Sequence, residues 1–263
     1  MKFFLSFCLL FFTFASFAQT DLLTYEQPLP CLNKKFTIVA NVVEDQFGNW
    51  NITEDEIREN VAAMNEHFAN ICVSFEVCEF RSVKNYQLDT LDSDLGDYEQ
   101  LVVEEHQANR INFYFVSEIA GADPLVCGFA NLGGIGVLDR DGIVIKKGNC
   151  ANPTTFAHEM GHYFGLQHTF EGSGEEHANG DNCETTGDQI CDTPADNFVV
   201  GQPMSSYVDG DCRYINTERD ENGDYYRPDV GNIMSYYPCA CGFTTGQFLK
   251  MAEVCRATNG RMW

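Results

Sequence analysis

Residues 158–168 read H-E-M-G-H-Y-F-G-L-Q-H, and the spacing in this stretch decides the expected chemistry and fold. His158 and His162 stand four residues apart, so on an α-helix their imidazoles lie one turn apart on one face and can bind a single zinc ion. Glu159 points about a third of a turn away. Its carboxylate would stay outside the ligand shell but close enough to hold a water beside the metal. The pattern therefore predicts two zinc ligands and a general base.

Gly165 and His168 complete this pattern. A residue without Cβ, three positions after His162, can adopt a positive φ, end the helix and turn the chain back towards the metal. His168 is then the expected third ligand. Three histidines leave one position of a tetrahedral zinc site open, which is the arrangement of catalytic rather than structural zinc sites.

The stretch matches the metzincin consensus H-E-x-x-H-x-x-G-x-x-H without substitution, so the chain resembles the metzincin metallopeptidases. Within that clan it resembles the pappalysin (M43) family in Thr169-Phe170, in G-D-Q-I-C-D-T-P at residues 187–194 and in N-I-M-S-Y at residues 232–236. The resemblance runs from about residue 35 to the C-terminus and is weakest over the N-terminal half. It implies a secreted zinc metalloendopeptidase that hydrolyses peptide bonds of proteins.

The resemblance also implies roles for two residues near the C-terminus. Met234 corresponds to the methionine of the metzincin Met-turn, which packs beneath the zinc ligands. Tyr236 corresponds to a tyrosine that can donate a hydrogen bond to the tetrahedral intermediate. Some pappalysins prefer a basic residue after the cut, through an acidic side chain shortly after the Met-turn. Residues 235–252 contain no Asp or Glu here, so the resemblance does not extend to that preference.

A structural calcium site is the third implication of the resemblance. Asp188, Cys191 and Thr193 match positions that bind Ca²⁺ through a carboxylate, a main-chain carbonyl and a threonine. Hard oxygen ligands on an irregular loop suit Ca²⁺ and would stiffen a region with little regular structure. The expected cofactors are therefore one catalytic zinc ion and structural calcium.

The N-terminus predicts export. Lys2 is followed by an apolar run over residues 3–14 and by Ser16-Phe17-Ala18, a small-x-small cleavage site, so residues 1–18 read as a signal peptide cut after about Ala18. The run is too short to span a bilayer. Residues 19–34 would form a short N-terminal or pro segment. Residues 35–263 would form one catalytic domain with subdomains at about 35–165 and 166–263.

Charge and cysteine content fit an exported protein with peptide partners. The chain carries 39 acidic and 16 basic residues, a net charge of −23, and no basic cluster, which argues against nucleic acid and anionic membranes as partners. Eleven cysteines follow residue 18, and most should form disulfides, with at least one thiol left over. Cys31 could be that thiol and could hold the enzyme latent by binding zinc, or it could be a disulfide partner or an ordinary free thiol.

Periodicity predicts the elements around the motif. Strands are expected at residues 35–43, 72–78 and 111–116, and a further pair at residues 128–138 and 143–146 should include the substrate-binding edge. Helices are expected from Thr53, from Asn152 to about Phe164, and over about 246–257. The predicted fold is α+β and metzincin-like. An α/β/α-like N-terminal subdomain would carry a mixed sheet, the active-site helix and a backing helix, and a mostly irregular C-terminal subdomain would follow.

Two other functions stay open on the sequence alone. The domain could be a non-catalytic, zinc-stabilised binding or adhesion module, although a purely structural zinc site has no use for Glu159 beside its ligands. It could also be a zinc hydrolase acting on a non-peptide amide. Activity on proteins compared with activity on small amides would separate these functions.

Overall fold

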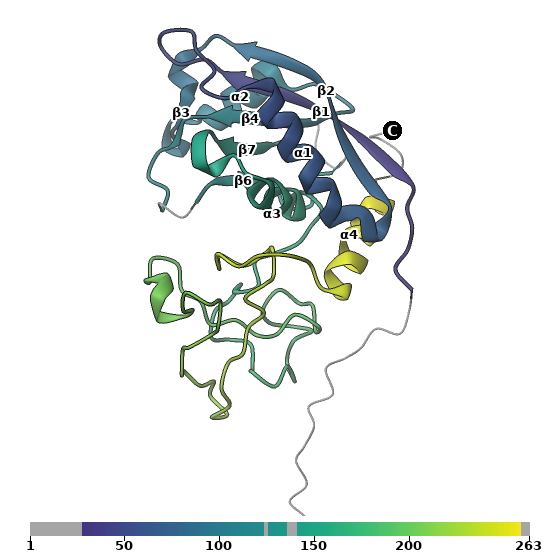
Figure 1. Ribbon diagram of the computed structural model, residues 1–263, viewed down its shortest axis with the longest axis vertical. Helices are drawn as coiled ribbons and strands as arrows, with labels where there is room; N and C mark the ends of the chain where they lie inside the picture. Colours follow the sequence, from purple (N-terminus) through teal and green to yellow (C-terminus); the bar gives the residue numbers. More distant parts are fainter. Residues whose placement is uncertain (1–27, 124–125, 136–140, 259–263) are drawn as a thin grey trace, which may run out of the picture.

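A five-stranded mixed sheet forms the upper part of the molecule in Figure 1, with strand order β2-β1-β4-β7-β6. The computed structural model describes residues 28–123, 126–135 and 141–258. The strands of this sheet are β1 (Lys34–Val43), β2 (Val73–Val83), β4 (Ile111–Val116), β6 (Gly128–Ala130) and β7 (Ile143–Lys146). Every pairing is parallel except that of β6, which lies antiparallel to β7 at one edge. The predicted mixed sheet is confirmed, and β2 begins one residue later and ends five residues later than the strand predicted at residues 72–78.

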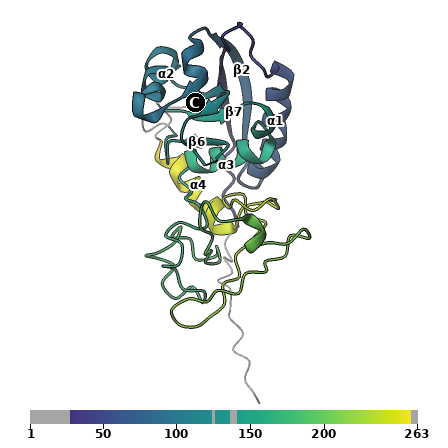
Figure 2. The same cartoon turned by 90° about the vertical axis from the view of Figure 1, so that its left-hand side faces the viewer.

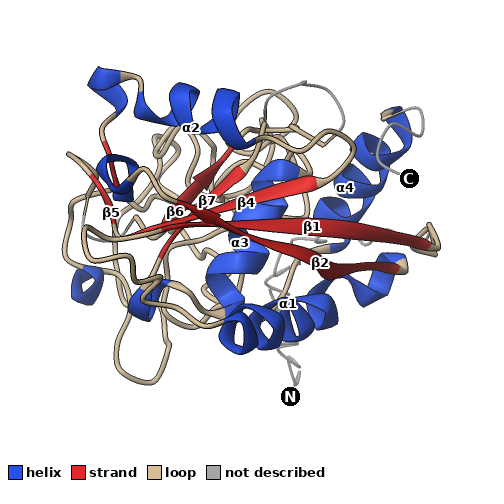
Figure 3. Ribbon diagram, turned by 90° about the horizontal axis from the view of Figure 1, so that it is seen from above, coloured by secondary structure: helices blue, strands red, loops and turns tan. Residues whose placement is uncertain are grey.

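One face of the sheet carries the two helices that the sequence predicted. Helix α1 (Glu54–Phe68) begins with the expected capping box between Thr53 and Glu56, and its apolar stripe is buried. Helix α3 (Pro153–Tyr163) begins after Asn152, whose side chain accepts a hydrogen bond from the N–H of Thr155. Both helices contribute to the main hydrophobic core beneath the sheet (Figure 3). This packing holds the motif helix against rigid strands.

The opposite face carries a helix that periodicity did not predict. Helix α2 (Asp97–Glu105) and helix α1 flank the sheet from opposite sides in Figure 2. Leu101 and Val102 of α2 are buried in a second core with Tyr114 and Val144. Tyr98, Leu101 and Val102 stand at i, i+3 and i+4 and pack into this core, but the repeat covers little more than one turn and is too short to indicate a helix by itself. The expectation of only two helices in this part of the chain was therefore wrong, while the α/β/α-like class is confirmed.

The chain after Gly165 is mostly irregular, as the lower part of Figure 1 shows. A third apolar cluster holds it together, with Phe170, Phe198 and Tyr237 among its buried members. Helix α4 (Thr245–Ala257) closes the chain and packs into the main core through residues such as Met251. The remaining short elements are strands β3 (Thr90–Leu91) and β5 (Glu118–Ile119) and the 3-10 turns η1 (Ala69–Ile71), η2 (Tyr86–Asp89), η3 (Ser93–Leu95), η4 (Gly148–Cys150) and η5 (Met204–Ser206).

Disulfide pairing decides between the alternatives left open for Cys31. Cys31 is bonded to Cys72, so it is not the spare thiol and is not available to bind zinc while that bond is intact. The other disulfides join Cys127 to Cys150, Cys183 to Cys191 and Cys212 to Cys239. Among the described residues the free thiols are Cys78, Cys241 and Cys255. The predicted signal peptide at residues 1–18 lies outside the described residues, as does most of the 19–34 segment.

Candidate active site

Three imidazoles converge where α3 ends. Nε2 of His168 lies 3.2 Å from Nε2 of His158 and 3.0 Å from Nε2 of His162. Zinc–nitrogen bonds of about 2.0–2.1 Å in a tetrahedron place their nitrogens roughly 3.3 Å apart, close to these separations. In the described part of the chain, this is the one group of three His, Cys, Asp or Glu side chains arranged to hold a metal. The residues therefore fit a zinc ion.

Main-chain carbonyls orient two of these rings. Nδ1 of His158 donates to the carbonyl of Ile233, and Nδ1 of His162 donates to the carbonyl of Leu166, both at 2.7 Å. A proton fixed on Nδ1 leaves the Nε2 lone pair free for a metal. Burial, followed by the neighbouring imidazoles, lowers the pKa of His158 to about 3, and the pKa of His168 is lowered for the same reasons. The rings are thus neutral, as metal ligands must be.

The turn after the helix depends on Gly165, which has φ +91° as its position in the motif predicted. A Cβ on Gly165 would lie 2.9 Å from Cγ2 of Val254 in α4, so the glycine also allows that helix to approach. The reversal brings His168 back beneath α3 and completes the triad.

Glu159 points into the same space from the next position of α3. It is 4% exposed, and burial raises the pKa of its carboxyl to about 8. Its Oε2 has no hydrogen-bond partner within the protein. This buried oxygen has no hydrogen-bond partner and lies beside three neutral imidazoles. Such a position suits a general base that accepts a proton from a water near a metal.

Position 128, which faces Glu159 from strand β6, can hold only glycine. A Cβ on Gly128 of β6 would lie 2.4 Å from the carbonyl of Val144 and 3.1 Å from Oε1 of Glu159. Any larger residue there would displace the edge strand or the carboxylate. Gly128 could not be recognised from the sequence, because one glycine in a glycine-rich segment has no distinguishing pattern.

Met234 lies beneath the helix that carries the ligands. A Cβ on Gly161 would lie 2.5 Å from its sulfur, so the glycine inside the motif makes room for the thioether. The carbonyl of Met234 accepts a hydrogen bond from the N–H of Thr169, next to His168. Met234 is fully buried and so occupies the position expected of a floor under the triad.

Tyr236 lies beside the triad. Its ring centroid is 4.9 Å from that of His168 and 5.8 Å from that of His158. Burial, followed by the charge of Glu159, raises the pKa of its phenol to about 12. The hydroxyl therefore keeps its proton at neutral pH and can donate a hydrogen bond.

Asp196 is a supporting residue that the sequence analysis missed. Its Oδ2 accepts from the hydroxyl of Thr169 at 2.8 Å, and its Oδ1 accepts from the hydroxyl of Tyr237 at 2.7 Å. Thr169 follows His168 and Tyr237 follows Tyr236, so one buried carboxylate joins the third ligand to the tyrosine segment. The partners are 27 and 41 residues away, a distance at which sequence spacing gives no signal.

Two pockets meet at Glu159. The first, named here the Thr155 pocket, has a volume of about 590 Å³ and lies between the start of α3 and the segment after Met234. The second, the Leu132 pocket, has about 850 Å³ and extends along β6 past Ala130 and Leu132. Both contain Gly128, His158 and Tyr236 in their walls, so they form one continuous cleft along the free edge of β6. An extended peptide can add to such an edge.

The residues expected to bind calcium lie away from this cleft. Asp188 and Thr193 are buried, and their side chains interact weakly, but neither Asp188 Oδ2 nor Thr193 Oγ1 has a hydrogen-bond partner of normal geometry. The side chain of Cys191 is bonded to Cys183, which leaves its carbonyl as its only ligand. The carboxylate of Glu176 approaches the same loop, because a Cβ on Gly187 would lie 2.0 Å from its Oε2.

Comparisons with known proteins agree with this geometry. A model of the M43 peptidases, described as pregnancy-associated plasma protein-A, matches residues 141–256, and a model of reprolysin-like M12B metallopeptidases matches residues 55–169. An extracellular metalloprotease of Colletotrichum graminicola is 31% identical over 170 residues, which are 61% of this chain and 56% of that protein. An extracellular metalloprotease of Arthroderma benhamiae is 24% identical over 217 residues, 79% of this chain and 72% of that protein.

A solved structure shares the fold. Mature mirolysin of Tannerella forsythia, in complex with a cleaved peptide, superposes with a TM-score of 0.58 at 18% identity and covers 87% of this chain and 98% of that one. The His triad, the two family models and the extracellular metalloproteases among the relatives support a metzincin-type metallopeptidase of family M43, and the shared fold agrees with this assignment.

Proposed function

We propose that this chain is a secreted zinc endopeptidase that hydrolyses peptide bonds of proteins. The observation that carries the proposal is the meeting of His158, His162 and His168 with the orphaned carboxylate of Glu159 in a cleft along a free strand edge. Extracellular metalloproteases among the relatives support secretion. The apolar run at residues 3–14 and the small-x-small site at residues 16–18 support a signal peptide cut after about Ala18. None of the described helices is long and apolar enough to cross a membrane.

Each side chain has a separate task in this reaction. The three histidines would hold zinc, which supplies Lewis-acid chemistry by making water more acidic and polarising a carbonyl. Glu159 accepts the proton of the attacking water and returns it to the leaving amine. Tyr236 donates a hydrogen bond to the oxyanion that develops on the carbonyl, and Met234 supports the ligands from below. The edge of β6 holds the peptide extended.

The test of this proposal is a comparison of wild type with Glu159→Gln on unfolded protein, with the zinc content of both measured. General acid–base catalysis contributes about 10²–10⁴-fold, so kcat/KM should fall by at least about 10² while zinc stays bound. Equal activity in the two proteins would remove Glu159 from the mechanism. Bound zinc without cleavage by either protein would favour the non-catalytic binding module, and cleavage of small amides alone would favour a different hydrolase.

We also propose that Asp188, the Cys191 carbonyl and Thr193 bind a structural calcium ion, with Glu176 as a further ligand. Two unsatisfied buried oxygens and a carboxylate brought in over Gly187 support this proposal. Burial, followed by the charges of Asp188 and Asp196, raises the pKa of Glu176 to about 8, which reflects a site that needs a cation to hold its charge. Calcium titration of wild type and Asp188→Asn tests it, because the variant should lose the high-affinity site.

A further inference from the structure

The Thr155 pocket has walls without a charge of their own. Apart from the active-site pair His158 and Glu159, its described lining contains no Lys, Arg, Asp or Glu. The walls away from the strand edge come from two segments, the first turn of α3 and the chain around the Met-turn, and consist of Thr154, Thr155, Ile233, Ser235, Tyr237 and Ala240. Glu159 is committed to the reaction, so none of these wall residues can pair with the charge of a bound Lys or Arg. Moving a charged Lys or Arg side chain from water into a pocket that offers no opposite charge is unfavourable.

The helix adds to this effect. Asn152 caps α3, Pro153 is its first residue, and Thr154 and Thr155 belong to the first turn that lines the pocket. The N-terminal end of a helix carries a partial positive charge, which disfavours a neighbouring cation and tolerates neutral or acidic groups. The helix N-terminus and the uncharged lining therefore both disfavour a cationic side chain in the Thr155 pocket.

Strand direction assigns the pocket to one side of the cleaved bond. β6 runs from Gly128 to Ala130. The Thr155 pocket reaches only its Cys127–Gly128 end, whereas the Leu132 pocket follows the whole strand from Val126 and continues past Ala130 to Leu132. A peptide added antiparallel to β6, the commoner pairing, runs in the opposite direction and enters at the Leu132 pocket. The residue that follows the cut then meets the Thr155 pocket.

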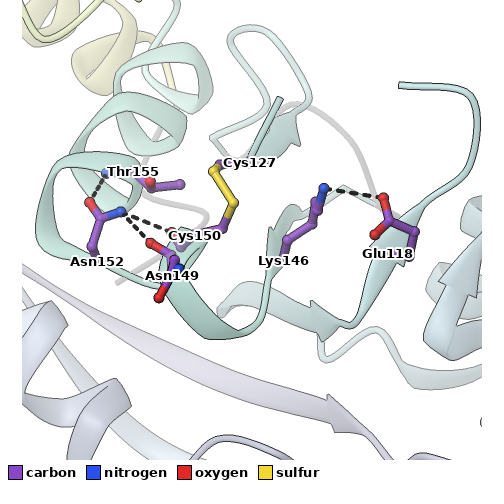
Figure 4. Close-up of a disulfide and its surroundings, with 7 residues drawn as sticks. All are labelled: Glu118, Cys127, Lys146, Asn149, Cys150, Asn152 and Thr155. Atoms are coloured by element: carbon purple, nitrogen blue, oxygen red, sulfur yellow. Dashed lines mark hydrogen bonds and ion pairs between the residues drawn. A yellow bond between two sulfur atoms is a disulfide. The ribbon is translucent and has the colours of Figure 1, made fainter. Parts of the chain in front are cut away.

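The pocket is also held in shape. Cys127, at the start of the edge strand, is bonded to Cys150, just before α3 (Figure 4). Nδ2 of Asn152 donates to the carbonyl of Asn149 at 3.0 Å, and Oδ1 of Asn152 accepts from the N–H of Thr155 at 3.0 Å. These links tie the strand-edge wall to the helix wall, so the two walls keep a fixed separation.

We propose that the Thr155 pocket receives the side chain of the residue after the cut and selects neutral side chains over Lys and Arg. The inference rests on the proposed peptidase function and narrows its substrate class to bonds that precede an uncharged residue.

The experiment uses the zinc-loaded mature chain and paired peptides that differ only in the residue after the cut, Leu or Arg. Wild type should cleave the Leu peptide with kcat/KM about ten-fold or more above the Arg peptide, the scale of discrimination that a pocket of this kind provides. Thr155→Asp adds a carboxylate to the wall at a helix position that tolerates Asp, and it should move the ratio towards Arg. Thr155→Asn matches that side chain in size without its charge and should leave the ratio near the wild-type value.

The outcomes separate two kinds of failure. Cleavage mainly before Lys or Arg by wild type would overturn the specificity, and so would a selection that acts only on the residue before the cut, because the peptide would then run in the other direction. An unchanged ratio in Thr155→Asp would also overturn it. No cleavage of any peptide or unfolded protein by zinc-loaded wild type would instead defeat the proposed function itself.

Discussion

At the scale of single residues, the site depends on side chains that orient the reacting groups as well as on the groups themselves. The carbonyls of Ile233 and Leu166 fix two imidazoles, and Gly161 and Gly128 leave room for Met234 and Glu159. Asp196 connects two parts of the site, because it accepts hydrogen bonds from Thr169, next to His168, and from Tyr237, next to Tyr236.

Asp196→Asn tests that positioning role. The amide keeps the size of the carboxylate but accepts with only one oxygen, so one of the Thr169 and Tyr237 hydroxyls loses its acceptor, at a cost of about 1–3 kcal/mol in unfolding free energy. We expect kcat to fall by a larger factor than KM rises, because Tyr236 is held less firmly when Tyr237 loses its hydrogen bond. Zinc should stay bound, because the three histidine ligands are unchanged. Thermal melting, zinc content and steady-state kinetics measure the three effects. Tyr237→Phe, which removes one of the two hydrogen bonds, should show a smaller loss of the same kind; an unaltered kcat in both variants would argue against the role.

At the scale of elements, the active-site helix is joined to the edge strand by both packing and a covalent bond. The Cys127–Cys150 disulfide spans 23 residues and links the approach to β6 with the turn before α3. The proposed peptide-binding edge lies on β6 and the catalytic groups on α3, so the relative position of these two elements should control both binding and rate.

Replacing Cys127 and Cys150 together by Ser should lower the unfolding free energy by about 3 kcal/mol, the entropy effect expected for a loop of this length. We also expect KM to rise and the discrimination between Leu and Arg after the cut to weaken, because the pocket wall is no longer tied to the helix. The matched control is Cys31→Ser with Cys72→Ser, which removes a disulfide outside the cleft. That control should lose stability without a change in discrimination, and an equal change in both pairs would mean that general loosening is responsible.

At the scale of the whole molecule, an irregular C-terminal part is attached to a well-ordered sheet. Residues 166–244 have little regular structure, and two disulfides and the apolar cluster around Phe198 stabilise this region instead. The two disulfides join Cys183 to Cys191 and Cys212 to Cys239. The Cys127–Cys150 disulfide lies outside this region and links the two walls of the cleft.

Stability of the calcium-free protein should fall as pH rises from about 5 to 8. Burial raises the pKa of Glu176 from 4.5 to about 8 and that of Asp188 from 3.8 to about 7. In this window the folded protein holds protons that the unfolded chain has released, so raising the pH favours unfolding. Calcium should weaken this dependence on pH by stabilising both carboxylates in their charged form.

Melting temperatures at pH 5 and pH 8, at fixed zinc and with or without added Ca²⁺, measure this effect. The fall between the two pH values should shrink when calcium is present. Glu176→Gln should flatten the calcium-free slope, because the titrating group is gone. An identical slope with and without calcium would contradict the proposed site.

The elements that could be predicted from the sequence are those specified by local spacing. The motif helix, the capping box of α1, strand β4 and helix α4 follow from residues a few positions apart, and the positive φ of Gly165 follows from its place after His162. Helix α2 was not predicted because its apolar repeat of Tyr98, Leu101 and Val102 covers little more than one turn, which is too short a pattern to indicate a helix before the sheet face that it covers is known.

By itself, therefore, the sequence determined the chemistry, because three histidines and a glutamate at fixed helical spacings can be recognised without knowing what surrounds them. Tertiary structure alone decided the partner of Cys31, the reach of Asp196 and the uncharged walls of the Thr155 pocket. These features depend on contacts between residues that are tens of positions apart. Only folding sets such contacts, because burial and hydrogen bonding act through space and leave no fixed spacing along the chain.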